Sequence, residues 1–311
     1  MIQLLRVVDG RLISAESLSQ SEIIRMVAPD EAELASIHEI TGAPIDFLTA
    51  ATDLDERPRM EVEDEAKLLI LRVPYENVGE SEEMPVVTIA FGVILTPSHI
   101  ISVCPLDSVV WDVFQKNRTR IPPVTRRGEF LCALFMSIAR LYLSQLQKIR
   151  NEADAAELEI HHSMRNEMLI RMLNLEKCLV YFTTSLRAHE PLWDRFRKIQ
   201  GRELSEDEQD MLDDVRIEFR QAQELADIHS NILSSMMDAF ASIISNNLNV
   251  VMKFLTSTTI ILMLPTLIAS VYGMNVELPF QHTPHAFLIT VGISLVLSVV
   301  GVIIFLRKRF F

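Results

Sequence analysis

A row of polar and thioether side chains runs through an otherwise apolar stretch near the end of the chain. Its members recur every three or four residues, so they share one face of a helix. Such a face can line a path for cations when several helices surround an axis. The same small residues can instead pack helices together in lipid, and the sequence leaves both interpretations open. The row comprises Asn249, Met252, Thr256, Thr259, Met263, Thr266, Ser270 and Gly273.

The same spacing continues toward the N-terminus with carboxylates and hydroxyls. Oxygen atoms are the ligands that hard divalent cations prefer. One helix face therefore presents carboxylates first and hydroxyls and thioethers later, which favours a cation path. Backward from Asn249, the face passes Ser245, Ser242, Asp238, Ser235, Asn231, Ile228, Glu224, Gln221, Ile217, Asp214 and Asp210.

Two bulky apolar residues, Met252 and Leu255, lie where this face enters the apolar stretch. Large apolar side chains near an axis can close a pore by excluding water, so they are predicted to form a hydrophobic gate. Contact with lipid or with other helices is the alternative. Pro265 removes one backbone hydrogen bond and can bend the helix, with or without a role in gating.

Two apolar stretches are long enough to cross a membrane. Residues 250–271 carry one charge, Lys253, and residues 286–306 carry none; each is close to the roughly 20 residues that a bilayer core requires. The link, residues 272–285, has no Lys or Arg, whereas residues 307–311 form a basic tail. Basic residues favour the cytoplasmic side, so we expect a multi-pass protein of the plasma (inner) membrane with both termini in the cytoplasm.

The beginning of the chain, residues 1–125, predicts a cytosolic α/β domain. A helical pattern covers residues 21–41, with Ser21 as a candidate N-cap. Runs rich in β-branched residues mix with it, which indicates layered sheet and helices. The candidate strands are residues 66–73, 86–95 and 99–103.

The following region, residues 126–203, is almost purely helical in pattern. One long helix is expected over residues 130–172, and a second run extends to Ile199. Pro191 is expected to interrupt or start a helix, because proline lacks a backbone donor.

Residues 204–249 predict a stalk helix that continues into the first span. Ser205 and Glu208 form a candidate capping box at its start. Stalk and span together would be on the order of 100 Å long. An apolar seam at heptad spacing argues that the stalk packs against neighbouring helices. The seam is Leu212, Val215, Phe219, Ala222, Ala226, His229, Leu233, Met236, Phe240 and Ile243.

The composition narrows the classes of function. The 311 residues carry a net charge of −13, which would repel nucleic acid. None of the three cysteines lies in a C-x-x-C pair, and an odd number cannot all form internal disulfides; a reducing cytosol is therefore expected. The N-terminus lacks the apolar core of a signal peptide. No P-loop, nucleophile elbow or zinc-spaced Cys/His cluster is present, so we expect no enzyme and no covalent cofactor.

The residues Tyr272, Gly273, Met274 and Asn275 directly follow the first span. In this hairpin, with a basic tail behind it, they resemble the signature of CorA magnesium channels. The segment from Asn249 to Thr256 and, farther upstream, Asp55-Glu56-Arg57-Pro58-Arg59 extend the resemblance. It covers essentially the whole chain and is most specific in the last 65 or so residues.

The resemblance implies a CorA-like funnel: a homopentamer whose first spans line the pore. It implies a ring of Asn275 at the outer mouth, where amide oxygens accept hydrogen bonds from hydrated Mg2+, and attraction of cations by Glu277. It also implies closure by regulatory Mg2+ bound between subunits, with Asp214 at a sensor position and Asp46 as its candidate partner. Solvated surface carboxylates are the alternative for both.

Three hypotheses follow. The first is a Mg2+ channel for influx, gated by cytosolic Mg2+. The second is the same architecture moving cobalt, nickel or zinc, for which His282 and His285 in the link are weak candidate ligands. The third is a membrane-anchored coiled-coil sensor or scaffold that conducts nothing.

Overall fold

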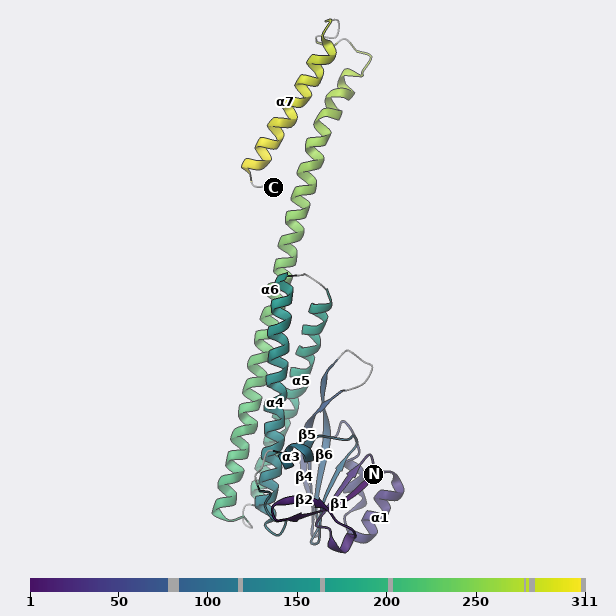
Figure 1. Ribbon diagram of the computed structural model, residues 1–311, viewed down its shortest axis with the longest axis vertical. Helices are drawn as coiled ribbons and strands as arrows, with labels where there is room; N and C mark the ends of the chain where they lie inside the picture. The colour runs from purple at the N-terminus through teal and green to yellow at the C-terminus, as the bar shows by residue number, and fades with distance from the viewer. Residues whose placement is uncertain are drawn as a thin grey trace. The chain divides into compact units, whose positions relative to one another are not determined.

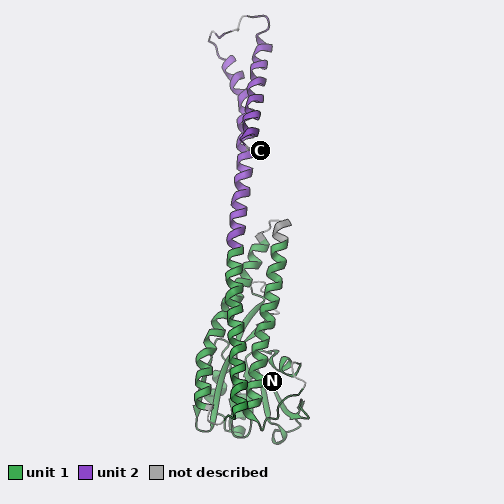
Figure 2. Cartoon of the chain, turned by 90° about the vertical axis from the view of Figure 1, so that its left-hand side faces the viewer, with its two compact units in different colours: residues 1–236 green, residues 237–311 purple. Residues whose placement is uncertain are grey.

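The computed structural model describes residues 1–77, 84–116, 120–162, 166–200, 204–276, 278–279 and 283–308. The chain divides into two compact units, unit 1 (residues 1–236) and unit 2 (residues 237–311) (Figure 2). The strands are β1 Ile2–Val8, β2 Arg11–Ser14, β3 Ile23–Val27, β4 Arg59–Glu63, β5 Ala66–Glu76, β6 Val86–Leu95 and β7 Ile100–Cys104. The α-helices are α1 Glu31–Thr41, α2 Ile45–Ala50, α3 Val110–Lys116, α4 Arg127–His162, α5 Asn166–Gln200, α6 Glu206–Tyr272 and α7 Ala286–Arg307 (Figure 1).

The sheet of unit 1 has the strand order β2-β1-β3-β7-β6-β5-β4. Strands β3 and β7 pair in parallel and the other described pairs are antiparallel. Residues 68–73 of β5 are buried without a break, as a strand covered on both faces requires. The predicted strands at 66–73, 86–95 and 99–103 are therefore confirmed as β5, β6 and β7.

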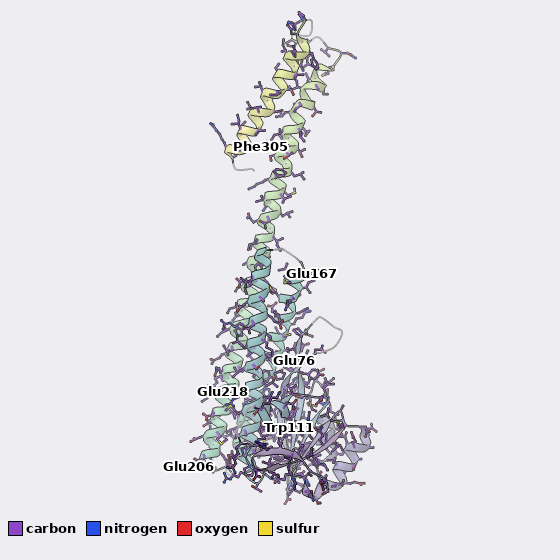
Figure 3. The ribbon with its side chains drawn as sticks, in the orientation of Figure 1. Glu76, Trp111, Glu167, Glu206, Glu218 and Phe305 are labelled. Atoms are coloured by element: carbon purple, nitrogen blue, oxygen red, sulfur yellow. The ribbon has the colours of Figure 1, made fainter. Side chains whose placement is uncertain are left out.

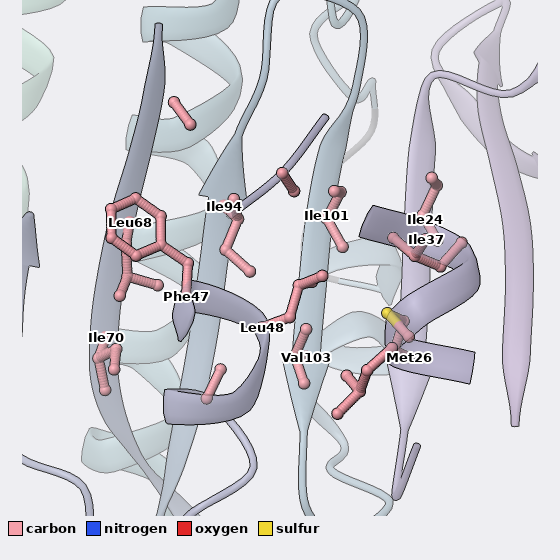
Figure 4. Close-up of a cluster of buried hydrophobic side chains, with 14 of the residues drawn as sticks. Ile24, Met26, Ile37, Phe47, Leu48, Leu68, Ile70, Ile94, Ile101 and Val103 are labelled. Atoms are coloured by element: carbon pink, nitrogen blue, oxygen red, sulfur yellow. The ribbon is translucent and has the colours of Figure 1, made fainter. Parts of the chain in front are cut away.

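Helices cover the two faces of the sheet. On one face, Phe47 of α2 lies beside Leu68 of β5, and Leu48 lies near Val103 of β7 (Figure 4). Helices α4 and α5 contact β5 and β6 on the other. Gly92 lets α2 lie close to the sheet, because a Cβ there would be 2.3 Å from that of Ala51.

The predicted helix over residues 21–41 is wrong in its first half. Residues Ile23–Val27 form β3, which is held between β1 and β7. Pro29 stops a helix from running through this segment. Helix α1 instead starts after Asp30, whose carboxylate accepts a 2.7 Å hydrogen bond from the Glu33 N–H in a capping box.

The predicted single helix over residues 130–172 is also wrong. Helices α4 and α5 form an antiparallel pair, in which the rings of Phe135 and Phe196 are 5.8 Å apart and those of Tyr142 and Phe182 are 5.2 Å apart. Burying these aromatic rings against each other requires the chain to reverse between the two helices, and one straight helix would separate them.

Pro191 lies inside α5 and neither starts nor ends it, contrary to the prediction. The residues that follow it, Leu192, Trp193 and Phe196, are buried. Their packing offsets the cost of about 3 kcal/mol that proline imposes in a helix interior.

Helix α6 begins as predicted. Ser205 Oγ accepts a hydrogen bond from the Glu208 N–H, and the Glu208 carboxylate accepts one of 2.9 Å from the Ser205 N–H. The same carboxylate accepts a 3.0 Å hydrogen bond from the Glu129 N–H. One side chain thus satisfies free donors at the starts of both α6 and α4.

The apolar seam of α6 packs inside unit 1, which confirms that the stalk helix contacts neighbouring helices. Phe219 lies 4.9 Å from the Trp193 ring of α5 and 6.3 Å from the Tyr142 ring of α4. Ion pairs flank the contact: Arg187–Asp227 at 3.1 Å and Arg216–Asp194 at 3.0 Å. The buried members of the seam in unit 1 are Leu212, Val215, Phe219, Ala222, Ala226 and Leu233.

Unit 2 consists of the last part of α6, the link and α7. Helices α4, α6 and α7 are each long and apolar enough to cross a membrane, but 72% of the most apolar window of α4 is buried, against 6% in α6 and 0% in α7. In Figure 3 many side chains of unit 2 project outward from its helices, whereas those of unit 1 crowd between its helices and strands. The predicted fold class, an α/β part with a long helix and two C-terminal apolar helices, is confirmed.

Candidate functional site

The polar face of α6 is exposed along its whole length. Every predicted member from Asp210 to Gly273 has an exposed side chain or, for the glycine, an exposed backbone. The face includes Asn249, Thr256, Thr259 and Thr266 within the predicted span. The chain therefore covers none of this face with its own described residues.

Helix α7 packs on a different face of α6. Ser257 is fully buried, and Ile261 and Leu264 are partly covered. A Cβ on Gly301 of α7 would lie 3.3 Å from Leu264 Cδ1 and 3.8 Å from Ile261 Cγ1. A small residue at this point lets the two helices approach closely, as is common in membranes.

The small polar residues of α7 lie on the side that faces α6. Thr290, Ser294 and Ser298 are partly covered, while most of their neighbours are exposed. The hydroxyls of Thr290 and Ser298 donate to carbonyls of their own helix. Helix α7 therefore leaves the polar face of α6 free for lipid, water or further copies of the chain.

The hydroxyls on the polar face of α6 have a common orientation. The Thr259 hydroxyl donates to the Leu255 carbonyl at 2.8 Å, and the Thr266 hydroxyl donates to the Leu262 carbonyl at 3.1 Å. Ser235 and Ser242 donate in the same way to carbonyls one turn earlier. Because each proton is engaged with the backbone, the oxygens present lone pairs outward and can accept hydrogen bonds.

The bulky residues predicted to form a gate lie on or beside this face. Met252 and Leu255 are 54% and 59% exposed, and Met263 is 62% exposed. In a single chain the described residues leave more than half of each of these side chains exposed. Several such helices around one axis would bring the side chains together and exclude water there.

Helix α6 ends at the four-residue signature. The Gly273 N–H donates to the Ala269 carbonyl at 2.9 Å and the Met274 N–H to the Val271 carbonyl at 3.2 Å. The Tyr272 hydroxyl donates to the Pro279 carbonyl at 3.3 Å, which ties the link to the helix end.

The side chain of Asn275 is exposed, and no described residue forms a hydrogen bond with it. It lies just beyond the C-terminus of α6, where the helix dipole places a partial negative charge of about half an electron. An amide at this position is free to meet a cation or its water. Glu277 and His282 lie outside the described residues.

The two predicted sensor carboxylates are exposed and lie in different layers of unit 1. Asp46 is in the first turn of α2, on the sheet face opposite to α4 and α5. Asp214 is on α6, which packs on α4 and α5, and it makes no ion pair with a described residue. The structure does not bring them together within one chain, and no group of three metal-binding side chains occurs among the described residues.

The sequence analysis missed a buried polar network in unit 1. Arg72, in the middle of the apolar run of β5, bonds through its side chain to Thr88, and the Thr88 hydroxyl lies 2.8 Å from that of Ser185 on α5. The backbone of Arg72 bonds to His189 and Tyr142. An arginine inside an otherwise apolar strand was the available signal, because a buried charge requires partners.

Burial sets the ionisation of this network. It lowers the pKa of His189 to about 3, with a further lowering by the Arg72 charge. Burial also raises the pKa of Tyr142 far above its usual range. Both groups are therefore neutral at physiological pH, and His189 Nε2 can accept the hydrogen bond from the Arg72 N–H.

Known proteins resemble this chain over nearly its full length. The family model described as CorA-like Mg2+ transporter protein matches residues 20–308. The cobalt/magnesium transport protein CorA of Methanocaldococcus jannaschii is 24% identical over 286 residues, covering 90% of this chain and 88% of the relative. The protein of the same name from Thermotoga maritima is 24% identical over 307 residues, covering 96% and 82%.

A solved structure shares the fold. The complete CorA magnesium transporter from Methanocaldococcus jannaschii superposes with a TM-score of 0.82 and 21% identity, and the match covers 99% of this chain and 98% of that one. The α/β unit, the long helix and the apolar hairpin thus recur together in that protein.

Proposed function

The chain belongs to the family of CorA-like Mg2+ transporter proteins, and on that premise we propose that it conducts Mg2+ into the cell along the polar face of α6. The observation that carries this proposal is the unbroken exposure of that face, from Asp210 to Gly273, while α7 covers another side. Copies of α6 around a common axis, five in a homopentamer, would enclose the face. The basic tail supports a topology with both termini in the cytoplasm and the signature outside.

The path suits a cation that keeps its water. Mg2+ loses its hydration shell reluctantly. The outward oxygens of Thr259 and Thr266 accept hydrogen bonds, and the hydrogens of a cation's hydration water are donors. Such a path therefore contacts the hydration shell instead of replacing it.

Asn275 acts at the outer mouth in this proposal. Five amide oxygens beyond the negative ends of five helices hold a hydrated cation without the strong binding that a carboxylate ring would impose. Glu277 raises the local concentration of cations. Met252 and Leu255 close the cytoplasmic end when their side chains converge and expel water.

Regulation is assigned to carboxylates on separate copies. Asp214 and Asp46 lie in different layers of one chain, so a Mg2+ ion that bridges them must join neighbouring subunits. Binding of cytosolic Mg2+ would then stabilise the closed assembly by mass action.

Cobalt is the second candidate cargo. Two relatives carry cobalt as well as magnesium in their names. Met252 and Met263 add thioether sulfur to the polar face, and sulfur favours softer metals than Mg2+. Nickel and zinc belong to the same alternative, with His285 of the link as a further nitrogen donor.

Uptake into vesicles tests the proposal. The purified chain, in vesicles with an interior-negative potential and a Mg2+-sensitive dye inside, should take up Mg2+; Co2+, Ni2+ and Zn2+ are offered in competition. Asn275→Ala should lower uptake about tenfold or more, equivalent to losing some 1.4 kcal/mol, while Asn151→Ala, an exposed asparagine of α4, should not change it. Absence of any divalent flux from a folded oligomer would favour a non-conducting scaffold.

A further inference from the structure

Arg72 is a buried positive charge without a buried counter-ion among the described residues. Its guanidinium bonds to the Thr88 hydroxyl at 3.3 Å, to the Thr88 carbonyl, and to the Leu54 carbonyl at 3.1 Å. The nearest carboxylate oxygen, on Asp55, is 3.7 Å away on a side chain that is 93% exposed. A charge buried on neutral acceptors is costly to maintain, so its position is tightly constrained by those acceptors.

Through these bonds Arg72 holds the loop between α2 and β4, residues 51–58. The loop carries Asp53 and Asp55 and directly follows α2, the helix of Asp46. The Leu54 carbonyl also accepts a 3.3 Å hydrogen bond from the Ala90 N–H. Any movement of α2 that shifts this loop therefore changes the hydrogen bonds of Arg72.

The backbone of Arg72 is held from the opposite layer. Strand β4 pairs with β5 only as far as Ile70, so the edge of β5 is open at Arg72. Two side chains replace the missing strand: His189 Nε2 accepts from the Arg72 N–H at 3.1 Å, and the Tyr142 hydroxyl donates to the Arg72 carbonyl at 2.9 Å. One residue thus connects the loop to both α4 and α5.

The connection continues from α5 to α6 through aromatic rings. His189 stacks on Trp193 at 6.1 Å, and both rings contact Phe219 of α6, at 5.0 and 4.9 Å. Phe219 is buried and lies within two turns of Asp214. The chain of contacts therefore runs from the loop beside α2 to the stalk helix without leaving unit 1.

Several polar groups of α5 along this series of contacts lack hydrogen-bond partners among the described residues. Thr183 Oγ1, His189 Nδ1 and Trp193 Nε1 are buried without a well-formed hydrogen bond among the described residues. Pro191 removes a further backbone donor from the same helix. A cavity of about 30 Å³, lined by Trp193, Phe219 and Arg220 among others, lies alongside. Of these groups Trp193 lines the cavity, and an unpaired donor beside free space allows a second arrangement of this turn, in which it finds a partner.

We propose that residues 183–193 of α5 form a two-state element that couples the 51–58 loop to helix α6, with Arg72 as the residue that positions it. The inference rests on the proposed control by cytosolic Mg2+, because that control supplies the movement of α2. When α2 shifts, Arg72 transmits the shift through Thr88 and Ser185 to the turn that contacts Phe219. The unpaired donor of Trp193 gains a partner in the second arrangement.

The test removes the hydrogen bond between the Thr88 and Ser185 hydroxyls and measures the response at Trp193. Thr88→Val keeps the shape of the side chain and removes the hydroxyl that joins Arg72 to Ser185. The chain has two tryptophans, so Trp111→Phe leaves Trp193 as the sole tryptophan, which can be excited apart from the tyrosines. In this background, titration of Mg2+ into the full-length protein should shift Trp193 emission with the same midpoint as the inhibition of Mg2+ flux.

In Thr88→Val we expect the midpoint of the Trp193 response and that of flux inhibition to move together by about two- to thirty-fold, the range in which residues between two sites modulate coupling. Ser185→Ala should do the same, and the double variant should add nothing to either single one. Ser137→Ala is the matched control, because its buried hydroxyl bonds only within α4, and its midpoints should stay with the parent.

Two outcomes separate this inference from the proposed function. If the parent shows Mg2+ inhibition and folded Thr88→Val and Ser185→Ala keep its midpoints, the coupling role is overturned and the channel proposal stands. If the parent conducts but shows neither Mg2+ inhibition nor a Trp193 response, the regulatory part of the proposed function fails, and the coupling inference falls with it.

Discussion

Unit 1 and unit 2 treat the same kinds of side chain in opposite ways. In unit 1 most of the large apolar residues are buried, and a charge as deep as Arg72 has several hydrogen bonds. In unit 2 apolar residues such as Leu262 and Phe287 are 68% and 78% exposed, and the polar face of α6 is open as well. Unit 1 buries its core within one chain, whereas unit 2 leaves most of its apolar side chains uncovered.

The two kinds of exposed surface in unit 2 call for two kinds of partner. Apolar side chains around α7 suit lipid, which needs no hydrogen bonds. The hydroxyls and amides on the polar face of α6 suit water and ions. The proposed membrane oligomer would provide both, with lipid outside and a hydrated path inside.

The first prediction has the largest expected effect, and its failure would contradict the contrast between unit 1 and unit 2. Phe135→Ala removes a fully buried ring that packs on Trp193 and Phe196, and should lower the free energy of unfolding of unit 1 by about 3–5 kcal/mol. Phe287→Ala, at an exposed position in unit 2, should change it by less than about 0.5 kcal/mol. Chemical denaturation followed by near-ultraviolet circular dichroism measures both; equal losses would contradict the contrast.

The second prediction concerns pH. His189 is neutral in the folded state because burial lowers its pKa to about 3, whereas the unfolded chain binds a proton below about pH 6.5. The unfolded state therefore binds more protons as pH falls, and unit 1 should lose about 2 kcal/mol of stability between pH 7 and pH 5. The contribution is fully present above pH 6.5.

His189→Gln identifies the source of that loss. Glutamine can still accept the Arg72 N–H but cannot take up a proton in this range, so this part of the pH slope should vanish. Denaturation at a series of pH values compares the variant with the parent. An unchanged slope in His189→Gln would assign the acid lability to other groups.

The last prediction tests whether α7 packs on α6 through Gly301 in unit 2. Gly301→Leu places a side chain where a Cβ is already 3.3 Å from Leu264, while Gly292→Leu, also on α7, meets open space. The first should destabilise the hairpin by about 1–3 kcal/mol and the second should not. Loss of helical signal on titration with a denaturing detergent measures the difference; equal sensitivity would mean that α7 does not pack on α6 through Gly301.

Local signals explain what could be predicted of the fold. The strands at 86–95 and 99–103, the capping box at Ser205 and the long α6 follow from composition and periodicity. Strand β3 was missed because a short segment with four apolar residues in five fits a helix as well as a strand. The break between α4 and α5 was missed because it depends on aromatic contacts between distant residues.

The candidate site likewise has a part that could be predicted from the sequence and a part that could not. The polar face of α6 could be predicted because one helix carries all of it at one spacing. The Arg72 network could not, since its members come from two strands and two helices that only the fold brings together. The pairing of Asp46 with Asp214 lies beyond one chain altogether, and it stays a prediction.

Accessibility of single cysteines along α6 tests the central claim most directly. The native Cys104, Cys132 and Cys178 are buried, so introduced thiols dominate the reaction with a charged, water-soluble thiol reagent. Cysteine at Thr256, Thr259 or Met263 should allow the reagent to block Mg2+ flux, and cysteine at Ile261 or Leu264, on the α7-facing side, should not. Block at the α7-facing positions, or at none of the five, would contradict the assignment of the polar face as the ion path.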